Sequence, residues 1–438
     1  MRLLIILIFF SITVFSQDNE NEEYYIDNHL RYEDFVYQDS ISSIKIFREG
    51  WELSYPFISL NTNDQVTLLF DDIGHDVRDF SYKIVHCTSD WKPSDLMPMD
   101  YLASQTYDMV SDYKFSFNTV VSYTNYRITI PNDDIQFTIS GNYLLIVYED
   151  DNEENLVLTA RFSVFEPITN IQANITKANQ IELRKFNQQV NFVVNINNLN
   201  LNDAYQEIKP VVLQNGFWCT AVSDIKPNFQ RDRELVYDYN DKLSFQAGNE
   251  YRNFDVKDLK YQSQYIKEIV FEDPFYHIKL YDDEPRPFKI YFSEHDINGD
   301  YLIKTNYRED SNTEGDYVHV YFTLPYDAPI VDGDLYIFGR LSNGAFTKAN
   351  RMIYNYQRKA YQLRLMLKQG YYNYQYVYLK DGETKPNLSY IEGSHWETEN
   401  DYQILIYFHG FSSRYDRLVG YETFNTLGEW QKKNDTKT

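Results

Sequence analysis

Cysteine is nearly absent from this sequence, which has only Cys87 and Cys219 in 438 residues. A fold held together by several disulfides is therefore excluded, even in an oxidising compartment. The two cysteines are far apart and fall in segments that we assign to different domains. A single bridge between them remains open, although two buried thiols are the interpretation that we favour.

Long apolar runs are also scarce. The clearest one, Leu3–Phe10, follows a basic residue and precedes the short segment Ser11–Ser16, which ends in residues that a signal peptidase can recognise. This order predicts a secretory signal over residues 1–16, whose cleavage leaves Gln17 as the new N-terminus. The run has about half of the ~20 residues that a transmembrane helix needs. We therefore expect a secreted, soluble chain without direct membrane insertion.

Basic residues are too few to balance the acidic ones, and the net charge is −24 at pH 7. Nucleic acid and anionic membrane surfaces would repel such a chain. We expect no nucleic-acid partner and interpret the acidity mainly as a contribution to solubility.

Patterns typical of catalytic and metal sites are missing. There is no G-x-S-x-G sequence, and the adjacent His86 and Cys87 would point to opposite faces of a strand, so they cannot bind one ion. The segment Asp296–Asp300 resembles part of a calcium loop but lacks the distal Glu, and its Asn298-Gly299 is typical of a hairpin turn, which we favour. We expect no enzymatic activity, no catalytic residue, no metal, no cofactor and no small-molecule substrate.

Alternating apolar and polar residues are abundant instead, and they predict strands bounded by turn residues. Asp71-Asp72 and Asp282–Glu284 are interpreted as solvated turns. The first set of strands is Gln65–Phe70, Tyr82–His86, Asn125–Ile130, Asn142–Tyr148 and Leu156–Phe165. The second set is Ile171–Ile175, Gln189–Ile196, Pro210–Gln214, Phe271–Leu280 and Lys289–Phe292. The third set is Tyr317–Leu324, Asp334–Phe338, Ala360–Leu367, Tyr372–Leu379 and Gln403–Phe408.

This spacing predicts an all-β protein made of three consecutive immunoglobulin-like β-sandwich domains. We place them at residues 17–167, 168–307 and 308–430, followed by a polar tail over 431–438. Tyrosine is unusually frequent, with 41 residues. Core packing explains most of them, and the excess mildly favours a protein-binding surface.

The third set of strands resembles a carbohydrate-binding module of the glycogen-binding type, which is a small β-sandwich. The resemblance is carried, in order, by Asp334–Gly339, Ser342–Gly344, Arg351–Asn355, Leu367–Tyr376 and Asp381-Gly382. Those modules commonly have a Trp after the Asn of the first loop, and that ring stacks on sugar. Gly344 occupies this position here. The resemblance implies a sandwich fold, and a secreted carbohydrate-binding protein is the alternative function.

The chain as a whole resembles the type IX secretion system plug protein family over about residues 25 to 425. The matching segments of the first set are Leu69–Asp72, Tyr82–Trp91, Ser116–Thr119, Tyr123–Tyr126, Ser140–Tyr143 and Leu158–Phe162. Further along they are Gln214–Trp218, Gly248–Asp255, Asp296–Gly299 and Tyr321–Leu324. The resemblance implies a non-enzymatic protein of the periplasm, associated with the outer membrane. It also implies that the protein binds the periplasmic mouth of the large translocon barrel and seals its pore when no cargo is in transit.

Two segments are candidates for the contact with that barrel, because they carry aromatic and apolar residues between turn residues. The first, Thr88–Tyr101, contributes Trp91, Pro93, Met97 and Tyr101. The second, Gly248–Asp255, contributes Tyr251 and Arg252. These six are the predicted partner-binding residues. Turn formation and core packing are the alternative for both segments, and for Trp91 a core position and an interface position are equally open.

Overall fold

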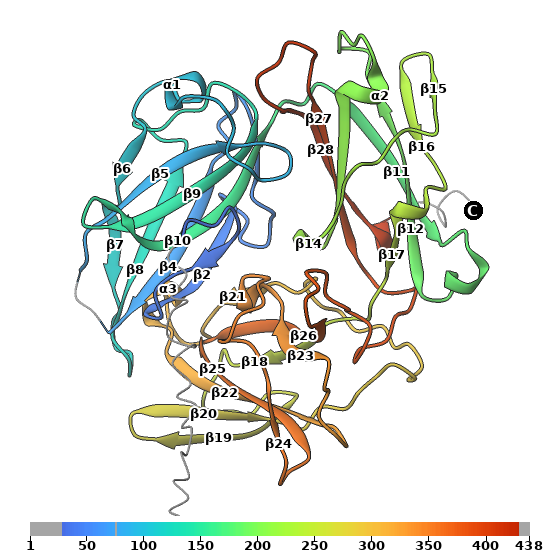
Figure 1. The fold of residues 1–438 in the computed structure, drawn as a ribbon. Coiled ribbons are helices and arrows are strands. Elements are labelled where there is room, and N and C mark those ends of the chain that lie inside the picture. The colour runs from blue at the N-terminus through green and yellow to red at the C-terminus, as the bar shows by residue number, and fades with distance from the viewer. Residues whose placement is uncertain (1–28, 75–76, 429–438) are drawn as a thin grey trace, which may run out of the picture. The chain divides into compact units, whose positions relative to one another are not determined.

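The computed structural model describes residues 29–74 and 77–428. Its regular structure is almost entirely β-strand, which confirms the predicted all-β fold class (Figure 1). The predicted signal over 1–16 and the polar tail over 431–438 lie outside the described residues. None of the helices in the described part is long and apolar enough to cross a membrane.

The first β-sandwich is built from strands that precede residue 167. One sheet has the order β1-β10-β9-β5-β6, with β3 paired to β10: β1 (Phe35–Val36), β3 (Phe57–Ser59), β5 (Phe80–Cys87), β6 (Tyr107–Met109), β9 (Gly141–Glu149) and β10 (Asn152–Phe165). The other has the order β2-β4-β8-β7: β2 (Ile41–Arg48), β4 (Val66–Ile73), β7 (Asp112–Phe115) and β8 (Tyr123–Ile130). Alternate residues of both sheets, such as Leu68, Ile128 and Leu145, meet in one apolar core.

The second β-sandwich is discontinuous in sequence. One sheet has the order β11-β12-β16-β15, with β17 paired to β12: β11 (Asn170–Lys177), β12 (Asn187–Asn195), β15 (Phe229–Arg231), β16 (Glu234–Tyr237) and β17 (Ser244–Gln246). The other has the order β14-β13-β27-β28: β13 (Ile208–Gln214), β14 (Phe217–Val222), β27 (Asp401–Phe408) and β28 (Arg417–Asn425). Figure 1 shows the last two strands, in red, beside the green ones.

The pairing of β13 with β27 explains this arrangement. Val212 and Ile404 are register partners and belong to the core of the second sandwich, whereas Val211 and Leu405 belong to a separate apolar cluster on the other face. A strand that is buried on both faces needs a neighbour on each edge, and β14 supplies only one. The chain therefore returns at residue 401 to complete this sheet.

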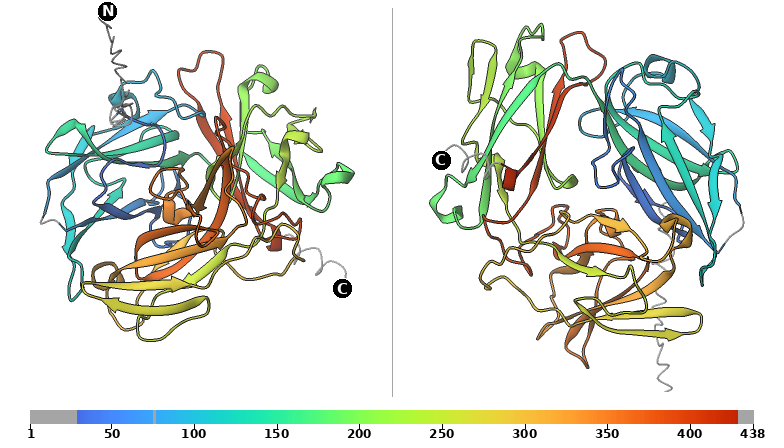
Figure 2. Two further views of the ribbon diagram at one scale, coloured as in Figure 1. Left: turned by 60° about the horizontal axis from the view of Figure 1, so that its bottom comes forward. Right: turned by 180° about the vertical axis from the view of Figure 1, so that it is seen from behind.

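The third β-sandwich is inserted between these two parts of the second (Figure 2). One sheet has the order β18-β26-β21, with β23 also paired to β26: β18 (Arg252–Asp255), β21 (Tyr301–Ile303), β23 (Gly333–Phe338) and β26 (Gly370–Lys380). The other has the order β19-β20-β22-β25-β24: β19 (Ile266–Glu272), β20 (Phe275–Leu280), β22 (Tyr317–Pro325), β24 (Ile353–Asn355) and β25 (Ala360–Lys368). The short helices are α1 (Pro98–Tyr101), η1 (Ile181–Leu183), α2 (Ala204–Glu207), η2 (Asp241–Leu243), α3 (Ser311–Glu314) and η3 (Arg340–Ser342).

The strand pairing therefore corrects the expected division into consecutive segments. The boundary placed at 307/308 falls inside the third sandwich, and Gln403–Phe408 belongs to the second. The expected single strand Phe271–Leu280 is a hairpin, because Asp273-Pro274 forms a turn between β19 and β20. The expected strand Lys289–Phe292 is in no sheet.

Tyrosine fills much of the three cores. Ten of the twelve largest fully buried side chains are Tyr, and the other two are Phe. Several of their hydroxyl groups reach from one sandwich to another: Tyr317 donates to Asp71 over 2.6 Å, and Tyr407 donates to Asn142 over 2.8 Å. A buried Tyr needs such a partner for its hydroxyl. The tyrosine content is thus explained mainly by cores and by contacts between sandwiches.

Candidate partner-binding surface

Trp91, the first predicted contact residue, is buried where the first and second sandwiches meet. Its ring packs edge-on against Trp218 of β14 at 4.9 Å between centroids. The Arg161 guanidinium lies 5.3 Å from the Trp91 ring and 5.5 Å from the Trp218 ring, and it pairs with Asp34 at 2.8 Å. Cation–π contacts and an ion pair thus hold this junction together. Trp91 binds another part of its own chain.

The rest of the Thr88–Tyr101 segment is divided between core and surface. Tyr101 is buried in the first core, and its hydroxyl donates to the Ile84 carbonyl over 3.0 Å. Pro93 and Met97 are exposed. Of the four residues predicted here, these two are therefore accessible to a partner.

Tyr251 and Arg252 are also enclosed by their own chain. Tyr251 packs with Phe217, Phe338 and Val377 where the second and third sandwiches meet. Arg252 pairs with Glu392 at 3.0 Å and with Asp283 at 2.6 Å. The structure thus places four of the six predicted residues in cores or junctions, and it does not bring the six together on one surface.

Glu392 is the centre of the charge network around Arg252. It is fully buried and accepts hydrogen bonds from Arg252, from Arg286 at 2.7 Å and from the Tyr376 N–H at 2.9 Å. Burial acts to raise the pKa of this carboxyl group, but the charges of the two arginines outweigh it and lower the pKa to about 2. The Glu392 carboxyl group is therefore ionised at neutral pH.

Asp71 is the most important residue that sequence reasoning missed. It was expected in a solvated turn, but it lies within β4 and is completely buried. Its carboxylate pairs with Lys368 Nζ at 2.7 Å and accepts hydrogen bonds from Tyr317 at 2.6 Å and Asn125 at 2.7 Å. Lys368 and Tyr317 belong to the third sandwich. An Asp-Asp pair in a sequence gives no signal for this, because Lys368 and Tyr317 lie 297 and 246 residues further along the chain.

The comparisons with known proteins agree with this architecture. The family model described as the first domain of the type 9 secretion system plug protein matches residues 41–166, which span most of the first sandwich. The crystal structure of a hypothetical protein from Parabacteroides merdae ATCC 43184 is similar with a TM-score of 0.88 and 34% sequence identity. That match covers 91% of this chain and 100% of the other. The chain belongs to the plug protein family of type 9 (type IX) secretion. No curated protein matches it.

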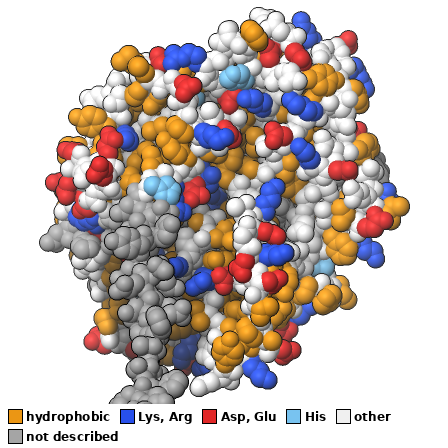
Figure 3. All heavy atoms as spheres, viewed as in Figure 1, with side chains coloured by type: hydrophobic (Ala, Val, Ile, Leu, Met, Phe, Trp, Pro, Cys, Tyr) orange, Lys and Arg blue, Asp and Glu red, His pale blue; other side chains and the backbone are white. Residues whose placement is uncertain are grey.

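In this plug-family protein, apolar side chains form separate groups between charged ones on the face seen in Figure 3. Met97 just before α1, Met99 within it and Phe411 in the loop between β27 and β28 are exposed. Arg414 of that loop donates to the Asp95 carbonyl over 2.8 Å and lies 3.5 Å from the Asp100 carboxylate. The loop of the second sandwich is thus held beside α1 of the first.

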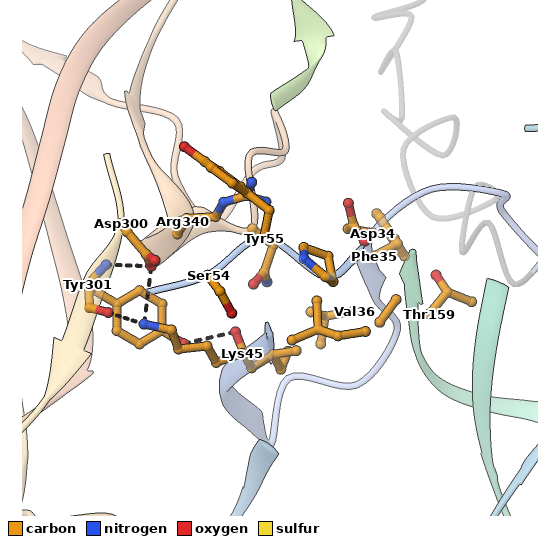
Figure 4. Close-up of a pocket in the computed structure, with 15 residues that line it drawn as sticks. Asp34, Phe35, Val36, Lys45, Ser54, Tyr55, Thr159, Asp300, Tyr301 and Arg340 are labelled. Atoms are coloured by element: carbon orange, nitrogen blue, oxygen red, sulfur yellow. Dashed lines mark hydrogen bonds and ion pairs between the residues drawn. The ribbon is translucent and has the colours of Figure 1, made fainter. Parts of the chain in front are cut away.

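A cavity of about 50 Å³ lies between β1, β2 and the loops of the third sandwich (Figure 4). This volume is small compared with the ~300–1,000 Å³ of typical small-molecule sites. An adjoining crevice of about 400 Å³ continues past Asn343. Lys45 pairs with Asp300 at 3.2 Å, and Arg340 donates to the Gly216 carbonyl over 2.8 Å. These charged groups are therefore already paired within the plug-family chain.

The loop that resembles a sugar-binding loop faces the second sandwich. At Gly344, a Cβ atom would lie 3.0 Å from the Phe217 ring, and the backbone has a φ of +65°. Neither the space nor the backbone suits a large stacking ring at this position. The resemblance of the third sandwich to a carbohydrate module stays a prediction.

Replacing Gly344 by Trp tests the interpretation that this loop has no room for a large stacking ring. We expect G344W to be destabilised by about 1–3 kcal/mol more than G382W, because Gly382 has a similar φ of +77° but no atom near its Cβ position. Thermal unfolding of both variants checks this, and calorimetric titration with glucans checks whether G344W gains binding. Equal stability of the two variants, or glucan binding by G344W, would contradict the reading.

Replacing Lys368 by Met tests the buried pair with Asp71. We expect K368M to lose about 3–5 kcal/mol of unfolding free energy, because it leaves the Asp71 carboxylate buried without its counter-charge. The control is K380M, which removes an exposed pair 3.7 Å from Glu383 and should cost less than about 1 kcal/mol. Denaturant unfolding followed by circular dichroism measures both. A K368M midpoint equal to that of K380M would show that the pair contributes little.

Glu250 gives a prediction about pH. Burial raises the pKa of its carboxyl group to about 7, although hydrogen bonds from Tyr291 and from the Glu399 N–H act in the opposite direction. Because the folded-state pKa exceeds the unfolded value of ~4.3, stability falls as the pH rises from about 4 to about 7 and stays reduced above that.

We expect E250Q to remove this loss. The variant should gain about 1–3 kcal/mol over the wild type at pH 8.5 and little at pH 4. The exposed Glu383→Gln change, which removes the same charge, is the control. Melting temperatures across pH 4 to 9 measure the difference, and parallel curves for E250Q and the wild type would disprove the assignment.

Proposed function

We propose that this protein binds the periplasmic mouth of the large outer-membrane translocon barrel of type IX secretion and seals its pore when no cargo is in transit. Membership of the plug family carries the proposal. Under this proposal the protein lies in the periplasm, against the inner face of the outer membrane, binds a protein partner and catalyses no reaction.

The contacts between sandwiches support a sealing role. A seal has to resist deformation, and each sandwich is tied to the other two by polar contacts. The contacts of Lys368 with Asp71 and of Tyr407 with Asn142 are buried, and that of Arg340 with the Gly216 carbonyl is partly buried. Such groups are costly to separate, because separation leaves buried charges and dipoles without partners. The three sandwiches therefore act as one stiff body.

The exposed methionines suit the contact itself. A seal that opens for cargo needs a reversible interface, and interfaces of that kind are modest in size and partly polar. Met97 and Met99 have flexible, polarisable side chains that adapt to different surfaces. We propose that Pro93, Met97, Met99 and Phe411 contact the barrel, while the buried Trp91, Tyr101, Tyr251 and Arg252 hold the parts behind them in place.

Isolation of the tagged full-length protein from detergent-solubilised outer membranes tests the partner. We expect the translocon barrel to be recovered with it in amounts that rise when cargo synthesis is shut off. Recovery of the tagged protein without any very large barrel protein would remove the proposal.

Deletion of the gene tests the sealing. With the translocon intact, we expect increased entry of large antibiotics that the outer membrane normally excludes, and a return to normal entry when the wild-type gene is restored. The same deletion in cells that lack the barrel is the control and should change nothing. Unchanged permeability in cells with an intact barrel would contradict sealing.

A further inference from the structure

The two most exposed apolar side chains in the described part of the third sandwich, Phe288 and Ile290, lie on one short segment. Phe288, Ile290 and Phe292 are 97%, 95% and 77% exposed. Ile290 and Phe292 flank Tyr291, which is half-buried against the chain, whereas Phe288 lies just before them in a turn, where the Lys289 N–H donates to the Arg286 carbonyl over 3.1 Å. From residue 290 to residue 292 this alternation is that of a β-strand with one apolar side facing outward.

The backbone of this segment has no strand partner. Within the described residues, no N–H or C=O group from Ile290 to His295 takes part in a backbone hydrogen bond, and none of these residues is in a sheet. The sequence KIYF nevertheless has the composition of a strand. A strand-like segment with free backbone groups and outward apolar side chains can bind by adding to the edge of another sheet.

The segment is held in place by contacts at both ends and in the middle. The Arg286 N–H donates to the Ile391 carbonyl over 2.7 Å before it begins. The Tyr291 hydroxyl contacts Glu250 and donates to the Glu397 carbonyl over 3.1 Å. The Glu294 carboxylate accepts a hydrogen bond from Tyr265 over 2.7 Å near its end. Binding would therefore cost less conformational entropy than the ordering of a free loop.

We propose that residues 290–295 form an unpaired strand that pairs with an open sheet edge of the translocon barrel protein, with Ile290, Phe292 and the preceding Phe288 entering apolar pockets beside that edge. The choice of this partner rests on the function proposed above. The mode of binding, strand addition, is inferred from the exposed side chains and unpaired backbone of the segment itself.

The charged residues near the segment indicate which residues the partner's sheet edge should carry. Asp282 precedes the segment and Glu294 ends it, whereas the charges of Glu284 and Lys289 offset each other in an ion pair. The rim of the segment is therefore acidic, and a complementary edge carries basic residues. A lipid surface is a poorer occupant, because free backbone groups cannot be satisfied in hydrocarbon and the chain has a net charge of −24.

The test measures binding of full-length variants to the purified, detergent-solubilised barrel. We expect Phe288→Ser, Ile290→Ser and Phe292→Ser together to weaken binding at least about tenfold. The matched control replaces Val331, Ile353 and Tyr356, three other exposed apolar residues of the same sandwich, by Ser. The control should bind like the wild type, and all variants should keep the wild-type melting temperature, because the replaced side chains are exposed.

Amide hydrogen exchange supplies the readout that is specific for strand addition. Amides 290–295 should exchange fast in the free protein and become protected in the complex. Wild-type affinity of the triple variant, or unprotected amides in the complex, would contradict the proposed strand pairing but not the proposed sealing function. Dimerisation or liposome binding that depends on these three residues would also overturn it. A wild-type protein that binds no barrel would remove both proposals.

Discussion

The Asp71 carboxylate is the group on which the assembly of this molecule most depends. It belongs to a strand of the first sandwich, yet two of its three partners, Lys368 and Tyr317, belong to the third. A buried carboxylate without a counter-charge is costly, so the first sandwich is fully stable only when the third is docked on it. One ion pair thus couples the stability of elements about three hundred residues apart.

Charges that are buried and paired within the chain are also found at the other junctions. Glu392 stays ionised because Arg252 and Arg286 lie against it, and Arg161 lies against two tryptophan rings while it pairs with Asp34. In each case a charge is removed from water and is then held by groups from distant parts of the chain. Such networks specify one arrangement of parts, because any other leaves a charge unpaired. A body assembled this way suits a role in which it blocks a passage without deforming.

The sequence was sufficient for features that depend on neighbouring residues. Alternation located segments such as Gln65–Phe70 and Tyr372–Leu379, because every second residue of these strands packs into one core, as Val66, Leu68 and Phe70 do. Features that depend on distant residues were not accessible. Asp71-Asp72 looks like a turn unless Lys368 is known to be opposite, and Gln403–Phe408 looks like part of the third set unless β13 is known to lack a neighbour. Trp91 and Tyr251 were predicted to contact the partner, whereas the structure places both rings in junctions within the chain.

The insertion of the third sandwich also bears on how the segment 290–295 is presented. The chain enters this sandwich near residue 248 and leaves it near residue 398. Hydrogen bonds join these two connections, because the Thr398 hydroxyl and the His395 N–H both donate to the Gly248 carbonyl, over 2.9 and 2.8 Å. Two connections that are tied together resist the rotation that a single linker would allow. The segment is therefore displayed without a prior domain movement, and whether it is bound depends on the partner alone.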